Sequence, residues 1–149
     1  MNQQKYATLL AFDYGRRRIG VAVGQSITCS ARPLTTINCI NQKPDWPLIE
    51  GLLTTWKPDA LIIGLPMNMD GTEHEMSKAA RRFSNQLHGR YGLPVELVDE
   101  RLTSIEASSR IAEQKLSKKK RLDKKTIDTV AAQLILESWF VQCHNNPTS

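Results

Sequence analysis

The first quarter of the chain contains short apolar runs separated by polar turns, a pattern typical of β-strands joined in succession. One apolar run, residues 7–12, ends at Asp13. A second, residues 19–24, follows a turn that contains Gly15, and a third extended segment, residues 29–37, is rich in threonine. The pattern predicts three consecutive antiparallel strands with short turns.

The period then changes from that of strands to that of helices. Apolar residues recur at spacings of three and four, which marks one face of a helix. They are Trp46, Ile49, Leu52, Leu53 and Trp56. A continuous apolar run at residues 60–64 predicts a strand covered on both faces. A second helix is predicted over residues 74–90. Its inward positions are expected to be Met76, Ala79, Ala80, Phe83 and Leu87.

The last third of the chain predicts one strand and two helices. The strand spans residues 95–99, and a helix capped by Thr103 or Ser104 runs to about residue 116. A basic loop follows, and the last helix spans residues 125–143. Its inward positions are expected to be Ile127, Val130, Ala131, Leu134, Ile135, Trp139 and Phe140. The polar residues 144–149 are expected to form a frayed tail.

The resulting order, β-β-β-α-β-α-β-α-α, predicts an α/β fold in which helices cover a mixed sheet. The chain has 149 residues, 40% of them hydrophobic, and shows neither a repeat nor a linker, so residues 1–149 are expected to form a single domain. No apolar run approaches the roughly 20 residues of a membrane span, and no secretory signal is evident. Three cysteines without a CxxC pair argue against a disulfide framework. We therefore expect a cytoplasmic protein with no membrane partner.

The net charge of +5 is concentrated in one short segment. Residues 115–125 contain seven basic residues and one acidic residue, whereas the remainder carries 13 basic and 14 acidic residues. This concentration favours a polyanionic partner such as nucleic acid, and the alternative is a solvated lysine-rich loop. The residues expected to bind nucleic acid are Lys118, Lys119, Lys120, Arg121, Lys124 and Lys125.

Three acidic residues stand where a functional site is expected. Asp13 and Glu100 lie at strand ends, and Asp128 lies in about the first turn of the last helix. Strand ends that are distant in sequence can meet at one edge of a sheet, where ligands commonly bind. Converging carboxylates would raise each other's pKa unless a cation neutralised them. An all-oxygen site suits Mg²⁺ or Mn²⁺, and two such ions about 3.5–4 Å apart can cleave phosphodiesters.

Each carboxylate also has a purely structural interpretation. Asp13 could hydrogen-bond its own backbone in a turn, and Glu100 could pair with a surface arginine such as Arg16. Asp128 could favour a helix N-terminus through the macrodipole. Asp99 competes with Glu100, because neighbouring strand residues point to opposite faces and only one of the two should face the site. The pattern alone does not choose between them.

Two loops add donors for phosphate. Arg16, Arg17 and Arg18 follow the first predicted strand, and the planar guanidinium of arginine suits phosphate oxygens. The loop at residues 64–71, which contains Asn68, offers amide donors at the same predicted edge. That loop could equally be a plain turn. Neither loop matches the glycine-rich signature of a P-loop or of a Rossmann nucleotide site.

Four segments together resemble one known family. They are LLAFDYGRRRIGVAVG (9–24), LIIGLPMNMDGTEH (61–74), VELVDERLTSIEA (95–107) and IDTVAAQLILESWF (127–140). In this order they are similar to the YqgF family, bacterial RNase H-like proteins described as pre-16S rRNA nucleases and as Holliday-junction-resolvase-like proteins. The resemblance implies an RNase H-like fold, with a mixed five-stranded sheet of three antiparallel N-terminal strands plus two parallel ones, flanked by helices.

The resemblance also implies a site. The acidic triad of the family falls on Asp13, Glu100 and Asp128, and it selects Glu100 over Asp99. These three would be both the catalytic residues and the ligands of one or two Mg²⁺ or Mn²⁺ ions. The chain departs from the family in the loop before the last helix, which often contains glycine and here reads LSKKKRLDKKT.

The implied activity is that of a metal-dependent nuclease acting on structured RNA, in 5′-end maturation of precursor 16S rRNA. RNA is favoured over DNA as the nucleic-acid partner, and ribosomal precursor particles are further expected partners. One alternative is a Holliday-junction-resolving DNA nuclease, which would need a dimer to cut two strands symmetrically. The sequence shows no dimer face, so it predicts no oligomeric state. The other alternative is a non-catalytic RNA-binding factor of ribosome assembly.

Overall fold

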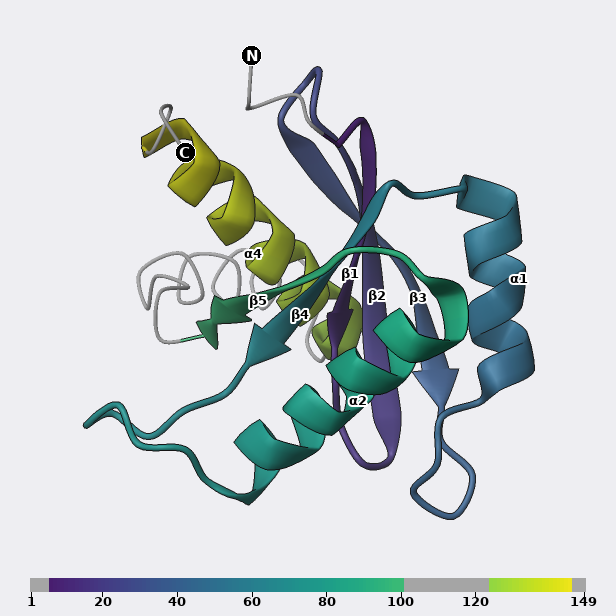
Figure 1. Ribbon diagram of the computed structural model, residues 1–149, viewed down its shortest axis with the longest axis vertical. Coiled ribbons are helices and arrows are strands. Elements are labelled where there is room, and N and C mark those ends of the chain that lie inside the picture. The colour runs from purple at the N-terminus through teal and green to yellow at the C-terminus, as the bar shows by residue number, and fades with distance from the viewer. Residues whose placement is uncertain (1–5, 101–123, 146–149) are drawn as a thin grey trace.

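Five strands form one mixed sheet with β1 at its centre (Figure 1). In the computed structural model, residues 6–100 and 124–145 are described. The strands are β1 (Thr8–Asp13), β2 (Arg18–Gln25), β3 (Ser30–Asn38), β4 (Ala60–Leu65) and β5 (Val95–Asp99), in the order β3-β2-β1-β4-β5. β1 and β3 run antiparallel to β2, whereas β4 runs parallel to both β1 and β5. The predicted mixed five-stranded sheet is confirmed, as are the succession of its strands along the chain and their directions.

Helices cover both faces of this sheet. They are α1 (Trp46–Trp56), α2 (Glu75–Tyr91) and α4 (Lys124–Asn145). α1 and α2 lie on one face and α4 lies on the other (Figure 1). α4 extends to Asn145, so the first two residues of the predicted tail are helical. The predicted helix ending near residue 116 and most of the basic loop lie outside the described residues. None of the described helices is long and apolar enough to cross a membrane.

Local signals explain where the helices on the first face begin and end. Asp45 caps α1, because its Oδ1 accepts a hydrogen bond from the Leu48 amide at 3.3 Å. Lys57, in the left-handed region at φ 47°, ends it. His74 caps α2 through its ring nitrogen, and Gly92, at φ 68°, ends that helix.

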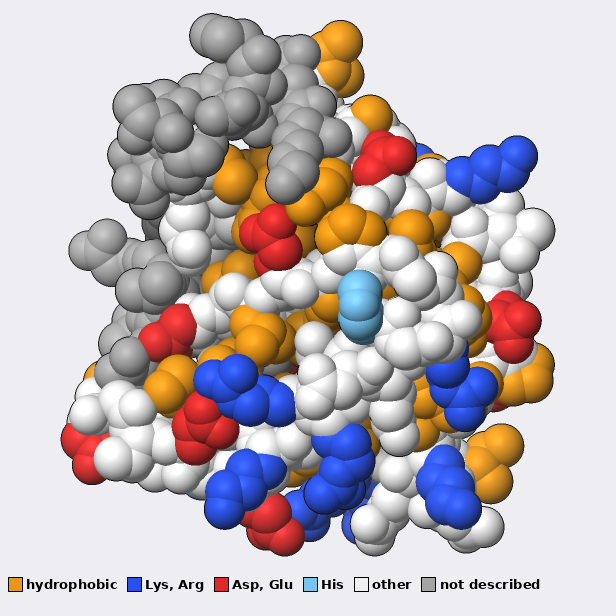
Figure 2. Space-filling model, in the orientation of Figure 1, with side chains coloured by type: hydrophobic (Ala, Val, Ile, Leu, Met, Phe, Trp, Pro, Cys, Tyr) orange, Lys and Arg blue, Asp and Glu red, His pale blue; other side chains and the backbone are white. Residues whose placement is uncertain are grey.

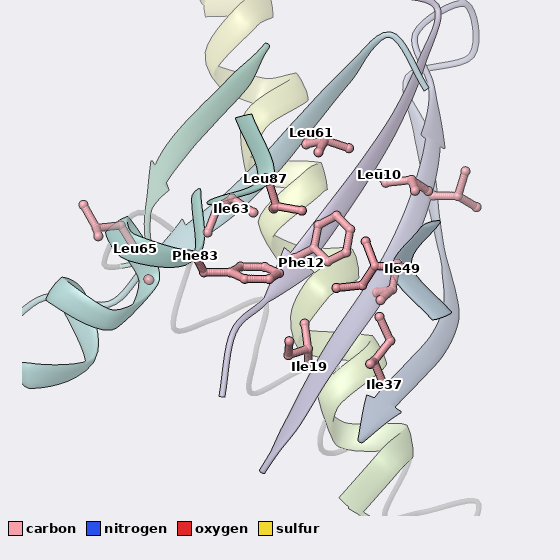
Figure 3. Packing of buried hydrophobic residues seen from close by; sticks show 13 residues of the cluster. Leu10, Phe12, Ile19, Ile37, Ile49, Leu61, Ile63, Leu65, Phe83 and Leu87 are labelled. Carbon is pink, nitrogen blue, oxygen red and sulfur yellow. The ribbon is translucent and has the colours of Figure 1, made fainter. Parts of the chain in front are cut away.

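The alternation of side chains along each strand divides the core into two layers. In β1, Leu10 and Phe12 face α1 and α2, whereas Leu9 and Ala11 face α4. Figure 3 shows the first layer, in which the rings of Phe12 and Phe83 meet edge to face with centroids 5.7 Å apart. Each odd-numbered residue of β1 therefore belongs to the α4 side of the sheet.

Small residues let α4 lie very close to the sheet. A Cβ atom added to Gly24 would stand 2.6 Å from the Leu136 side chain and 2.9 Å from the Ser30 carbonyl oxygen. A Cβ atom on Gly20 would stand 2.0 Å from the carbonyl oxygen of Asp128. The backbone of α4 thus packs almost directly on the backbone of β2.

The buried side of α4 agrees only in part with the predicted one: Val130, Ile135, Trp139 and Phe140 are buried as expected. Ile127 is 50% exposed, and Ala131 and Leu134 are only partly buried, so their predicted inward placement is wrong. Ala132 and Leu136 are fully buried instead. The reason is that α4 turns the side of residues 128, 132 and 136 towards the glycines of β2, where large side chains do not fit.

The α4 contact predicts the effect of adding one methyl group. Gly24→Ala should lower the free energy of unfolding by about 1–3 kcal/mol, because the new Cβ overlaps the Leu136 side chain and the Ser30 carbonyl. Gly51→Ala is the matched control, since Gly51 lies inside α1 with no atom within 4 Å of an added Cβ. It should raise the free energy of unfolding by about 0.5–1 kcal/mol. Urea unfolding measures both, and equal effects of the two substitutions would contradict the packing described here.

Candidate functional site

The carboxylate of Asp13 lies at the carboxyl end of the central strand, on the α4 side. Asp13 is the last residue of β1, and it follows Leu9 and Ala11 in the alternation that faces α4. Its partner across the antiparallel pair is Gly20. Because Gly20 has no side chain, the α4 turn that contains Asp128 comes directly beside the end of β1.

Glu100 reaches the same place from the other half of the sheet. Val98 is buried on the α4 side, so Glu100, two residues later, is in register with that face and Asp99 is in register with the opposite one. A Cβ atom on Gly64 of β4 would stand 2.6 Å from the Glu100 Oε2 atom. A second glycine therefore makes room for a second carboxylate.

Asp128 is the fifth residue of α4, just beyond its first turn. The Arg18 side chain donates from Nε to the Asp128 Oδ2 atom at 2.8 Å, and both side chains are largely buried, with 28% and 22% exposed. Because the first turn of α4 contains no acidic residue, the macrodipole interpretation of Asp128 loses its basis. Arg18, expected to bind phosphate, already holds a carboxylate here.

The three carboxylates interact electrostatically. Burial raises the pKa of Asp13 from its ordinary value of 3.8 to about 7, and the negative charges of Glu100 and Asp128 raise it further in the same direction. Burial is also the larger cause of the raised pKa of Glu100, and the negative charge of Asp99 is the smaller one. Arg18 neutralises Asp128, but among the described residues no cation pairs with Asp13. Within the described residues, the negative charge of Asp13 is therefore not offset by an ion pair.

The donor chemistry of the cluster fits a hard divalent cation. All its side-chain donors are carboxylate oxygens, the ligands that Mg²⁺ and Mn²⁺ prefer. Within residues 6–100 and 124–145, no three His, Cys, Asp or Glu side chains are already spaced as direct ligands of one ion. Mg²⁺ commonly keeps several waters and binds through one or two carboxylates plus substrate phosphates, so such spacing is compatible with its coordination.

The remaining predicted residues are distributed around this edge. Arg16 and Arg17 are exposed in the β1–β2 turn, and the Arg16 Nη2 atom lies 2.8 Å from Glu75 Oε1. Asn68 is exposed in the loop after β4, where its side chain donates to the Thr72 hydroxyl at 2.9 Å. The loop therefore forms a hydrogen-bonded turn, and the contact of Asn68 with nucleic acid stays a prediction.

Most of the basic segment at residues 115–125 lies outside the described residues. Lys118, Lys119, Lys120 and Arg121 lie outside the described residues. Lys124 opens α4 and is followed by Lys125, in the turn that precedes Asp128. Their predicted contacts with nucleic acid stay predictions.

Sequence reasoning missed the two glycines that make room for the carboxylates. Gly20 and Gly64 leave space for Asp128 and Glu100 on the α4 side of the sheet. The signal was present in the sequence, since small residues fall on every second position of IGVAVG and at the end of the run LIIG. Alternation of this kind marks the strand face on which a helix packs closely.

Solved structures share this fold. A Thermus thermophilus RuvC in complex with a Holliday junction substrate matches with a TM-score of 0.59 and 15% identity, covering 93% of this chain and 96% of that one. The fowlpox virus Holliday junction resolvase matches with a TM-score of 0.52 and 12% identity, covering 91% and 99%. At such low identity the likeness establishes the fold, an RNase H-like sheet flanked by helices.

Sequence relatives are much closer. A protein of Cronobacter sakazakii is 52% identical over 135 residues, which cover 91% of this chain and 96% of the relative. One of Pectobacterium carotovorum is 49% identical over 140 residues, covering 94% and 99%. Both are named "Putative pre-16S rRNA nuclease". The model of the RuvX family, described as Holliday junction resolvase, matches residues 7–142. With that match over most of its length, the chain belongs to the RuvX family of nucleases.

Proposed function

We propose that this protein is a metal-dependent nuclease that cleaves structured RNA, in maturation of the 5′ end of precursor 16S rRNA. The observation that carries the proposal is the partly buried group of Asp13, Glu100 and Asp128, in which burial first, and the charges of Glu100 and Asp128 next, raise the pKa of Asp13. A group of this composition gains stability from a divalent cation. The names of relatives at about half identity support precursor rRNA as the substrate.

Within this proposal the three carboxylates hold one or two Mg²⁺ or Mn²⁺ ions. When bound there, such ions would supply a water that is nucleophilic at neutral pH and would stabilise negative charge on the leaving oxygen. Arg18 positions the Asp128 carboxylate by holding its Oδ2 atom, as groups around metal ligands commonly do. Arg16 and Arg17, exposed in the adjacent turn, supply phosphate contacts that position the strand without reading its sequence.

The activity is proposed to belong to ribosome biogenesis in the cytoplasm, because precursor rRNA is made and processed there. Ribosomal precursor particles would then present the substrate. RNA is preferred to DNA on the strength of the relatives' names. The family description gives the opposite preference and makes a DNA junction nuclease the second candidate.

Incubation of the purified full-length chain with three substrates separates the candidates. The substrates are precursor rRNA, a four-way DNA junction and unstructured single-stranded RNA, each with Mg²⁺, Mn²⁺ or EDTA. Metal-dependent cleavage of precursor rRNA at its 5′ end is the expected result. Cleavage of the junction alone would favour the resolvase. RNA binding that persists in EDTA, with no cleavage of any substrate, would identify an assembly factor.

Removing one carboxylate charge tests the site itself. Asp13→Asn keeps the size of the side chain but removes a metal-ligand charge, so cleavage should fall by about two orders of magnitude or more. Asp99→Asn is the control, because it removes the same charge from the end of β5 on the opposite face of the sheet. Single-turnover assays at saturating Mg²⁺ measure both. Wild-type cleavage by Asp13→Asn would assign the activity to another site.

The raised pKa of Asp13 predicts a pH dependence of stability without metal. The folded protein keeps the proton up to about pH 7, whereas the unfolded chain loses it near its ordinary pKa. Stability from this group is therefore complete below about pH 4 and is lost as pH rises through about 7. Between about pH 5 and 8 in EDTA the free energy of unfolding should fall by about 2–3 kcal/mol.

Two comparisons check this expectation by urea unfolding at constant ionic strength. Asp13→Asn should flatten the pH dependence, because the titrating group is gone. Added Mg²⁺ should stabilise the wild-type protein more at pH 8 than at pH 5, since ligands must be deprotonated. Parallel curves for wild type and Asp13→Asn would show that Asp13 has an ordinary pKa.

A further inference from the structure

A polar pocket opens at the same end of the sheet, on the face covered by α1 and α2. Its volume is about 320 Å³. Its polar lining consists of Tyr14, Arg16, Gln42, Glu75, Lys78 and Arg82. Three cations and one carboxylate give this lining a net charge of +2. Figure 2 shows lysine and arginine side chains gathered over α2 and the neighbouring loops at the lower end of this face. Of these residues, the sequence predicts only Arg16 to bind nucleic acid.

Two of the three cations of the pocket act electrostatically on the Tyr14 hydroxyl. The guanidinium groups of Arg82 and Arg16 both act to lower the pKa of Tyr14, although burial and the neighbouring Cys39 raise it overall. The hydroxyl therefore stays protonated at neutral pH and is available as a hydrogen-bond donor in the pocket. The Tyr14 ring is held against the Phe83 ring, with centroids 4.9 Å apart.

The backbone around the pocket is fixed by contacts that need no ligand. The Cys39 amide donates to the Arg17 carbonyl at 2.8 Å, which ties the β1–β2 turn to the end of β3. The turn itself is tight, since a Cβ atom on Gly15 would stand 2.6 Å from the Arg18 carbonyl oxygen. The pocket is thus built into the strand ends.

The two neighbouring arginines of α2 have different environments. Arg81 is paired with Glu73 through both Nη2, at 2.7 Å, and Nε, at 2.8 Å. Arg82 lines the pocket and forms no ion pair with any residue in the described ranges. Arg16 is paired with Glu75, but that pair is exposed, with 43% and 81% of the side chains accessible. Exposed pairs contribute about 0–1 kcal/mol, so an anionic ligand can displace this one.

The pocket and the carboxylate cluster lie on opposite sides of one strand end. Asp13 and Tyr14 are consecutive residues, so their Cα atoms are about 3.8 Å apart. Asp13 is on the α4 side, and the Tyr14 ring packs against α2 on the other side. We propose that the pocket lined by Tyr14, Arg16, Lys78 and Arg82 binds a backbone phosphate of the RNA strand next to the scissile one. This assignment rests on the proposed function and adds a second anchor to it.

Two matched pairs of substitutions test the pocket in the full-length chain. Arg82→Gln removes a pocket charge, and Arg81→Gln removes the same charge from the adjacent position outside it. Binding of a labelled single-stranded RNA is measured in EDTA over a range of salt concentrations. Arg82→Gln should weaken binding and reduce the slope of log K against log[salt] by about 0.7, the value for one lost phosphate contact on a single strand. Arg81→Gln should leave that slope unchanged.

The second pair predicts a gain of affinity. Glu75→Gln removes the carboxylate that competes for Arg16, so RNA should bind roughly two- to fivefold tighter, the factor that corresponds to releasing an exposed ion pair. Glu73→Gln, which frees Arg81 instead, should have a smaller effect. Equal effects of the two substitutions within either pair would contradict phosphate binding in the pocket, because the change in net charge alone would then explain the change in RNA affinity.

Competition with inorganic phosphate shows whether the pocket binds a phosphate of a nucleic-acid strand or a free anion. At constant ionic strength, phosphate should compete with RNA only weakly, because a strand contacts the protein at several phosphates. Phosphate binding as tight as that of RNA, and lost in Arg82→Gln, would overturn the assignment to a strand. The outcome is independent of cleavage: an effect of Arg82→Gln without any nuclease activity would support the pocket and refute the proposed function. Cleavage abolished by Asp13→Asn with no effect of Arg82→Gln would do the reverse.

Discussion

The close contact between α4 and the sheet determines how the acidic residues are arranged. α4 can approach β2 and β4 only because Gly20, Gly24 and Gly64 present no side chains to it. The same contact buries Asp13 at the end of the central strand, where water would otherwise solvate its charge. At the start of α4, helix packing therefore stabilises the fold while the loss of carboxylate hydration destabilises it. The helix gains a large apolar interface farther along, and the carboxylates at its start lose hydration.

Arg18 offsets only part of that loss. Its guanidinium lies 2.8 Å from the Asp128 carboxylate, so Asp128 has a cationic partner within the described part of the fold. Burial, and then the negative charges of Glu100 and Asp128, raise the pKa of Asp13, and no cation pairs with Asp13 among the described residues. A protein that kept these acids only for stability would gain more from neutral residues of the same size. The arrangement makes physical sense if a cation from solution completes it.

The hydrophobic pattern predicted most of the secondary structure, because the helices bury one face at helical spacing and the central strands are continuous apolar runs buried on both faces. The sheet followed from three early strands and two buried apolar runs. The pattern failed along α4, where Ile127 was expected inside and Ala132 was not, since glycines on the sheet decide which side of the helix fits. It could not choose between Asp99 and Glu100, which needed the register of β5 against β4. The Arg18–Asp128 pair joins residues 110 positions apart, and nothing local in the sequence indicates it.

Strand alternation gives the end of β1 two different chemical environments. Asp13 faces α4 among carboxylates, and Tyr14, one residue later, faces α2 among cations. A nucleic-acid strand carries phosphates at regular intervals, and a phosphate that binds to the protein is stabilised by a nearby positive charge. One phosphate can find it in a cation held by the carboxylates, and the next can find it in the arginines of the pocket. Because both environments are fixed to the same strand, the distance between them is set by the backbone of the sheet. A strand bound at both would cross the sheet edge at β1, which places its scissile bond without any contact to its bases.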